Sequence, residues 1–120
     1  TVEPEGYDDV VRSLASGVIV PVENPGPARC DALQTLKMVQ LSYDTLRAQS
    51  ARAMAVTETE AARAVGFAFR VLKLVVEPAG AVALAAALSG RADIAGKTVV
   101  VILSGGNVEP AVFAECLAVG

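Results

Sequence analysis

Apolar and polar positions alternate at helical spacing through much of this sequence. The pattern predicts helices over 10–16, 58–74, 79–88 and 110–119. Apolar side chains three and four residues apart also indicate one or two helices between 31 and 50. Thr57 and Glu60 have the spacing of a capping box, in which a hydroxyl and a later carboxylate satisfy free N–H groups. The second helix is therefore expected to begin at 58.

Short apolar runs without helical spacing predict strands. Residues 98–103 form a continuous β-branched run, which is typical of a strand buried on both faces. Residues 53–56 predict a shorter strand, and 1–4 read as the end of another. Prolines make 23–29 a loop, and Ser104–Asn107 is expected to form a tight glycine turn before the last helix.

This order of elements indicates the fold class. Strands that alternate with helices predict an α/β fold: a partial three-layer open sheet, mainly parallel, with flanking helices. So few strands would leave the edges of the sheet uncovered. We therefore expect residues 1–120 to form a single incomplete α/β domain.

Composition narrows the possible functions. The chain is 53% hydrophobic with a mean hydropathy of +0.50, which fits a slab of a larger protein or one side of an oligomer interface. No apolar run is long enough to span a bilayer, so a soluble cytoplasmic protein with no membrane partner is expected. A net charge of −3 without a basic stripe argues against nucleic-acid binding.

The chain also lacks the residues of several catalytic classes. There is no histidine, and Cys30 and Cys116 lie far apart in the sequence. These facts exclude Cys–His nucleophilic pairs and speak strongly against zinc ligation. Any chemistry must come from a cofactor, a metal or another segment.

Three polar features have both a structural and a functional interpretation. The acidic opening turn is either solvated charge or a helix cap supplied by Asp8 or Asp9. Ser104–Asn107 is either a phosphate cradle before a helix or a turn without a ligand. Glu77 precedes a helix start, where an acid is stabilised by the helix dipole.

Four sequence blocks resemble one known family. Residues 3–9 (EPEGYDD), 30–33 (CDAL), 72–83 (LKLVVEPAGAVA) and 101–108 (VILSGGNV) are similar, in this order, to blocks of the threonine dehydratase and serine racemase family. That family uses pyridoxal phosphate (PLP). Any one block is weak evidence, but together they are strong evidence, because they are distributed from residue 3 to residue 108 in the family's order.

The resemblance implies a type II PLP enzyme, with a large α/β domain and a smaller inserted domain. The family converts threonine or serine to a 2-oxo acid and ammonia, racemises serine, or acts on hydroxyaspartate. This chain would be the C-terminal half of the large domain. The family's reactive lysine, asparagine loop and glycine-rich phosphate cup precede all four blocks, so we expect a fragment that is inactive alone, completed by an N-terminal half or by homo-oligomerisation.

The resemblance also implies cofactor contacts. It puts the Ser104 hydroxyl against the pyridine nitrogen, with Gly105 and Gly106 allowing the backbone to pass close to the ring. A neutral hydroxyl would not hold that nitrogen protonated, which suits β-elimination of water from a hydroxy amino acid. Glu77 would lie near the ring, and Ala32 stands where the family often has glycine.

A cation site is implied at the opening turn. The family's ligands correspond to the carboxylates of Glu3 and Asp9 and the backbone carbonyl of Tyr7. Hard oxygen ligands suit Mg²⁺ or Ca²⁺. Tyr7 replaces a residue that is usually small, and the ion would be structural or activating.

No lysine of this chain is expected to replace the family's reactive one. Lys73 and Lys97 occupy positions that the family uses structurally, and Lys37 is expected to be exposed. The second hypothesis is therefore that this chain is a non-enzymatic protein derived from the family and acts as a self-associating or binding module.

Overall fold

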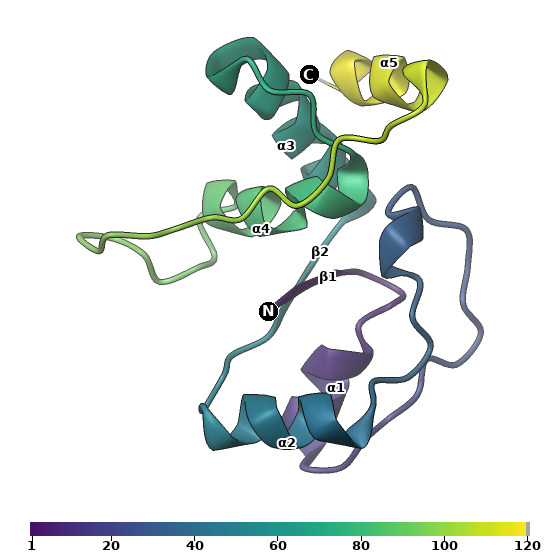
Figure 1. Ribbon diagram of the computed structural model, residues 1–120, viewed down its shortest axis with the longest axis vertical. Helices are drawn as coiled ribbons and strands as arrows, with labels where there is room; N and C mark the ends of the chain where they lie inside the picture. The colour runs from purple at the N-terminus through teal and green to yellow at the C-terminus, as the bar shows by residue number, and fades with distance from the viewer. Residues whose placement is uncertain (120) are drawn as a thin grey trace.

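The computed structural model describes residues 1–119 (Figure 1). Its elements are β1 (Val2–Pro4), α1 (Asp9–Ser16), the 3₁₀ turn η1 (Asp31–Leu33), α2 (Gln40–Ala48), β2 (Met54–Val56), α3 (Glu58–Phe67), its π-helical continuation η2 (Ala68–Leu72), α4 (Pro78–Leu88) and α5 (Pro110–Ala118). Helices α3, α4 and α5 lie on one side of the β1–β2 pair, and α1 and α2 lie on the other.

The sheet is small and parallel, which confirms the α/β class. β1 pairs with β2 in the register Val2 to Met54 and Pro4 to Val56. The Glu5 N–H extends the ladder by donating to the Val56 carbonyl over 2.8 Å. The predictions of strands at 1–4 and 53–56 are confirmed, and they bring the opening acidic turn close to the start of α3.

The prediction of a strand over 98–103 is wrong for the part of the chain that the structure describes. This segment is extended and runs alongside α4, but it has no hydrogen-bonded neighbour (Figure 1). A β-branched run favours extended backbone, whereas a strand also requires a partner for its N–H and C=O groups. Val100 is 87% exposed and Ile102 is 72% exposed.

The predicted tight turn at Ser104–Asn107 is also wrong. The backbone continues without a turn from 98 to the start of α5. Neither Gly105 nor Gly106 has a positive φ angle, so the two glycines are not needed for a left-handed turn. Their lack of side chains serves close packing instead, as described below.

The predicted helices are confirmed with small shifts at their ends. The capping box of α3 is complete, since Glu60 N–H donates to Thr57 Oγ1 at 3.0 Å and Thr57 N–H donates to Glu60 Oε2 at 2.8 Å. Arg91 adds an ion pair to the same carboxylate at 2.7 Å. The helix expected over 58–74 changes to π geometry at η2 and ends at Leu72, and Lys73 follows as the C-cap with a φ of 62°.

Small side chains let the helices of the main core approach closely. α3 and α4 pack against each other through alanines such as Ala61, Ala64 and Ala85, which are nearly or fully buried. Val56 and Cys30 join them from β2 and the loop before η1. Within residues 1–119, none of the helices has the length and apolar character needed to cross a membrane.

Candidate functional site

A cleft of about 560 Å³ opens where three helices begin. Its walls are Pro27, Ala28, Arg29, Asp31, Glu58, Glu77, Pro78, Asn107, Val108, Glu109 and Val112. Glu58 is the first residue of α3, and Glu77 and Glu109 are the N-cap residues of α4 and α5. The partial positive charge of a helix start stabilises a carboxylate at such positions. The cleft is thus acidic at its rim and bordered by backbone N–H groups.

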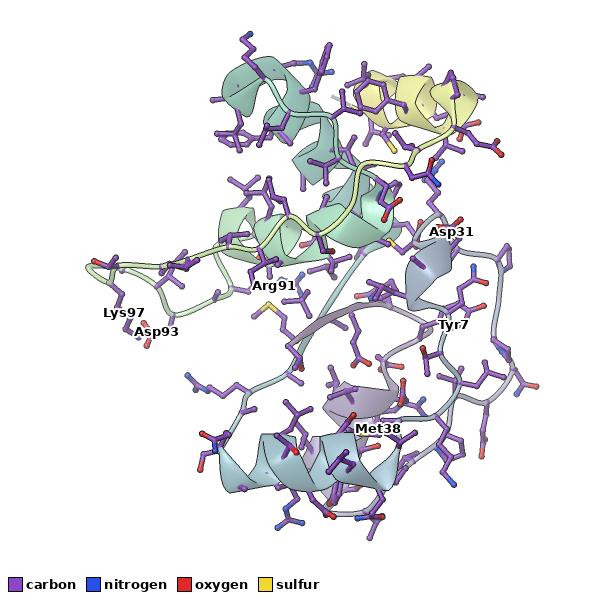
Figure 2. The ribbon with its side chains drawn as sticks, viewed as in Figure 1. Tyr7, Asp31, Met38, Arg91, Asp93 and Lys97 are labelled. Carbon is purple, nitrogen blue, oxygen red and sulfur yellow. The ribbon has the colours of Figure 1, made fainter. Side chains whose placement is uncertain are left out.

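The cleft unites residues from three of the four sequence blocks. Asp31 comes from η1 and lies beside the start of α4 (Figure 2), Glu77 comes from the α4 entry, and Asn107 comes from the extended stretch. Of the predicted cofactor contacts, Glu77 lines the cleft directly. Ala32 is exposed next to Asp31.

Ser104 is exposed and lies three residues before Asn107, outside the residues that line the cleft. Its hydroxyl makes no hydrogen bond within residues 1–119. A serine hydroxyl can donate one hydrogen bond and accept two. Ser104 therefore offers an uncommitted neutral donor and acceptor on the stretch that leads to Asn107.

The two glycines after Ser104 are packed against the entry of α4. The Glu77 N–H donates to the Gly105 carbonyl over 3.0 Å. A Cβ on Gly105 would collide with Glu77 Oε1, and one on Gly106 would lie 2.7 Å from the Val75 carbonyl oxygen. A side chain at 106 would press on the Val75 backbone and push this stretch away, whereas one at 105 would displace the Glu77 side chain.

Glu58 also lines the cleft, although the sequence did not indicate a functional role for it. Its Oε2 accepts the Arg29 N–H at 2.9 Å, while its Oε1 is buried without a partner among residues 1–119. Burial, followed by the nearby Glu58 carboxylate, raises the pKa of the Cys30 thiol to about 12. Cys30 is therefore an inert core residue rather than a nucleophile.

Two residues of the cleft wall have weak signals in the sequence. Glu58 follows the capping threonine and is expected there only as the first residue of the helix. Asn107 belongs to the quoted block at 101–108 but was interpreted only as part of a turn. The convergence of both on one cleft depends on tertiary packing and could not be derived from spacing.

The side chain of Glu3, seven and eight residues before its partners in the sequence, caps the N-terminus of α1. The Glu3 carboxylate accepts the N–H groups of Val10 at 3.1 Å and Val11 at 2.9 Å. The prediction that Asp8 or Asp9 caps this helix is wrong, because the side chain at the N-cap position makes no capping bond. Burial is the main cause that raises the pKa of Glu3, and the two N–H groups oppose it.

Asp9, the other predicted carboxylate ligand, has a structural partner, and the side chain of Tyr7, whose backbone carbonyl is the predicted ligand, is also held. Asp9 Oδ2 accepts the Met38 N–H at 2.7 Å, and the Tyr7 hydroxyl donates to the Gly26 carbonyl. Among residues 1–119, no three Asp, Glu, His or Cys side chains form a group that could hold a metal ion. The site formed by Glu3, Tyr7 and Asp9, which includes a backbone ligand, stays a prediction.

The three lysines considered above lie elsewhere in the described part of the chain, and none lines the cleft. Lys97 pairs with Asp93 at 2.6 Å in the loop after α4 (Figure 2). Lys73 Nζ donates to the Arg70 carbonyl at 2.7 Å. Lys37 lines a second cavity of about 380 Å³ near α1 and α2.

Comparison with known proteins defines the class. Residues 1–105 match the family described as "Pyridoxal-phosphate dependent enzyme", and the chain belongs to this family. Solved structures agree with this assignment. Threonine deaminase from T.th. is 37% identical with a TM-score of 0.80, covering 90% of this chain and 39% of its own. Maize serine racemase is 28% identical with a TM-score of 0.81, covering 97% of this chain and 36% of its own.

The curated relatives are enzymes that act on hydroxy amino acids. Phenylserine dehydratase of Ralstonia pickettii is 38% identical over 99% of this chain and 36% of its own length. L-threo-3-hydroxyaspartate ammonia-lyase of Saccharomyces cerevisiae is 32% identical over 98% of this chain and 36% of its own. The chain therefore spans about a third of the length of these relatives.

Proposed function

We propose that this chain supplies one wall of the PLP site of a hydroxy-amino-acid ammonia-lyase or racemase. The observation that carries the proposal is the exposed Ser104 hydroxyl, which has no hydrogen-bond partner within residues 1–119 and stands three residues before Asn107 in the cleft wall. The relatives named above make a β-hydroxy amino acid such as threonine, serine or hydroxyaspartate the proposed substrate class.

The residues present fit the ring of such a cofactor but not its phosphate, because the described residues that line the cleft include Asp31, Glu58, Glu77 and Glu109 beside a single arginine. Another segment would have to hold the phosphate. A flat aromatic ring with one ring nitrogen needs a single polar contact at that nitrogen and room for its faces. Ser104 offers the contact, and the close packing of Gly105 and Gly106 against Glu77 and Val75 holds the backbone that follows Ser104. The cleft of about 560 Å³ is large enough for a ligand of this size.

The proposed division of labour follows from these side chains. When bound, PLP withdraws electrons from the substrate α-carbon and makes its proton acidic. The Ser104 hydroxyl orients the ring through the pyridine nitrogen and, being neutral, leaves that nitrogen without a proton. Glu77 holds the Ser104 segment against α4 and contributes negative charge beside the cleft. Ala32 would border the ring where it meets η1.

A divalent cation at Glu3, Tyr7 and Asp9 remains part of the proposal. Both carboxylates are held in place by backbone N–H groups, and a carboxylate oxygen can accept more than one partner. Mg²⁺ or Ca²⁺ would stabilise the turn that connects β1 to α1. Cation binding would then appear as a higher midpoint of thermal unfolding.

A binding partner for the exposed apolar surface is proposed as well. Val100 and Ile102 on the extended stretch and Leu41 on α2 are 87%, 72% and 78% exposed. Such surface is unfavourable in water and supports coverage by a homo-oligomeric contact or by an N-terminal half of the enzyme. The same observation supports the alternative of a non-enzymatic self-associating module in the cytoplasm. Sedimentation velocity across a concentration range tests self-association.

The cofactor proposal is tested by titrating PLP into the protein at its natural full length and following the absorbance of the bound cofactor. Replacing Ser104 with alanine removes one hydrogen bond and is expected to weaken PLP binding about three- to tenfold. Ser42, an exposed serine on α2, provides the matched control Ser42→Ala. Equal affinity for PLP in the wild type and in Ser104→Ala would overturn the role of Ser104.

A further inference from the structure

We propose that Gly80 is a positioning residue that fixes where the Ser104 hydroxyl stands. The inference rests on the proposed PLP site and adds a residue to it. Gly80 lies in the first turn of α4 and is buried. Its role would be to let the backbone of Gly105 lie directly on the helix.

The contact between Gly80 and Gly105 leaves no space for a methyl group. A Cβ on Gly80 would lie 2.8 Å from both the backbone nitrogen and the backbone oxygen of Gly105. Real Cβ atoms essentially never approach other heavy atoms below 3.0 Å. Because both atoms belong to the backbone, no side-chain rotation can relieve the collision.

The stretch is held by neighbours of Gly80 as well. The Glu77 N–H donates to the Gly105 carbonyl over 3.0 Å. A Cβ added at Gly106 would lie only 2.7 Å from the Val75 carbonyl oxygen, so Gly106 is also packed closely against the backbone. These contacts fix the two residues that follow Ser104 in the sequence. The position of Ser104 is thereby coupled to the surface of α4.

An alanine at position 80 must therefore move the extended stretch. Relief from 2.8 Å to an ordinary contact of at least 3.4 Å requires a displacement of about 0.6 Å. A misplacement on the order of 1 Å can cost a factor of about 100 when geometry is critical. We expect Gly80→Ala to change both the environment of the Gly105 amide and the affinity for PLP.

Another glycine of this chain provides a matched control. Gly26 lies in the loop before η1, and a Cβ there would meet nothing within 4 Å. Gly26→Ala therefore adds the same methyl group without pressing on the backbone. Gly66 would be a poorer control, because its Cβ would meet the guanidinium of Arg70.

The experiment has two readouts on the full-length protein labelled with nitrogen-15 at glycine. The first is the pair of amide resonances of Gly105 and Gly106 in the absence of PLP. The second is the affinity for PLP, measured by titration. We expect Gly80→Ala to shift both resonances and to weaken PLP binding at least about fivefold, because the hydroxyl leaves its contact. Gly26→Ala should change neither.

Two results would overturn the inference: unchanged Gly105 and Gly106 resonances in Gly80→Ala, or shifted resonances with unchanged PLP affinity. If Gly80→Ala does not fold, Gly106→Ala tests the same packing of the stretch through the Gly105 resonance alone, because its methyl group presses on the Val75 carbonyl. A wild-type protein that binds no PLP would overturn the proposed function instead. The glycine resonances would still decide whether Gly80 fixes the stretch.

Discussion

The backbone N–H of Glu77 donates to the carbonyl of Gly105, and the side chain of Glu77 covers the position that a Cβ of Gly105 would occupy. This relationship joins the entry of α4 to the stretch that carries Ser104. It explains why a glycine stands at 105 although its backbone does not adopt a positive φ. The preference for glycine at position 105 arises from its contact with the Glu77 side chain.

A double-mutant cycle between these two residues tests the contact. Gly105→Ala places a methyl group against the Glu77 carboxylate and should lower the free energy of unfolding by about 1–3 kcal/mol. In a Glu77→Ala background the methyl group finds space, so the same substitution should cost less. We expect a coupling free energy of about 0.5–3 kcal/mol from urea denaturation of the four proteins. Equal costs in both backgrounds would show that Glu77 does not exclude a side chain at 105.

The pH dependence of stability should have opposite signs at two glutamates. Hydrogen bonds from Thr57, with a contribution from Arg91, lower the pKa of Glu60 below its ordinary 4.5. The stabilisation from ionised Glu60 is therefore present above pH 4.5 and is lost as pH falls through the lower folded-state pKa. Glu60→Gln keeps a capping amide and should lack this dependence.

Glu3 should behave in the opposite way. Its pKa is raised above the ordinary value of 4.5, chiefly by burial, so the folded state retains the proton more strongly than the unfolded state. The contribution of Glu3 to stability should fall as pH rises from 4.5 through the folded-state pKa, and stay constant above it. Urea denaturation of the wild type, Glu3→Gln and Glu60→Gln between pH 3 and 8 measures both differences. If the contributions of Glu3 and Glu60 to the free energy of unfolding changed with pH in the same direction, the opposite pKa shifts of these two residues would be contradicted.

The cysteines should resist alkylation in the folded protein. Both are fully buried and free. With a pKa of about 12 instead of 9.0, Cys30 has about a thousandfold smaller thiolate fraction at pH 8. Burial also raises the pKa of Cys116. Iodoacetamide should therefore modify neither residue in buffer and both in urea, as read by mass spectrometry. Rapid modification of native Cys30 would contradict its buried position.

Local signals in the sequence were sufficient for most of the helices. The capping box at Thr57 and Glu60 predicted the start of α3, and Pro110 predicted the start of α5. Both signals depend on residues a few positions apart, and they act whatever surrounds them. The α/β class followed from the same order of elements.

Features that depend on distant residues were not predictable in this way. The run at 98–103 carries a strand's composition, but its pairing depends on a neighbour that residues 1–119 do not provide. The capping of α1 by Glu3 joins residues seven and eight positions apart, outside any local capping pattern. The role of Glu58 in the cleft likewise became visible only with Asp31 and Asn107 beside it.

The most direct test of the central claim is the protonation state of the cofactor ring nitrogen. PLP labelled with nitrogen-15 in its ring is bound to the full-length protein, and its resonance is compared between the wild type and Ser104→Asp. We predict an unprotonated nitrogen beside the neutral Ser104 hydroxyl and a protonated one beside the introduced carboxylate. A nitrogen whose resonance is the same in both proteins would show that Ser104 does not face the ring.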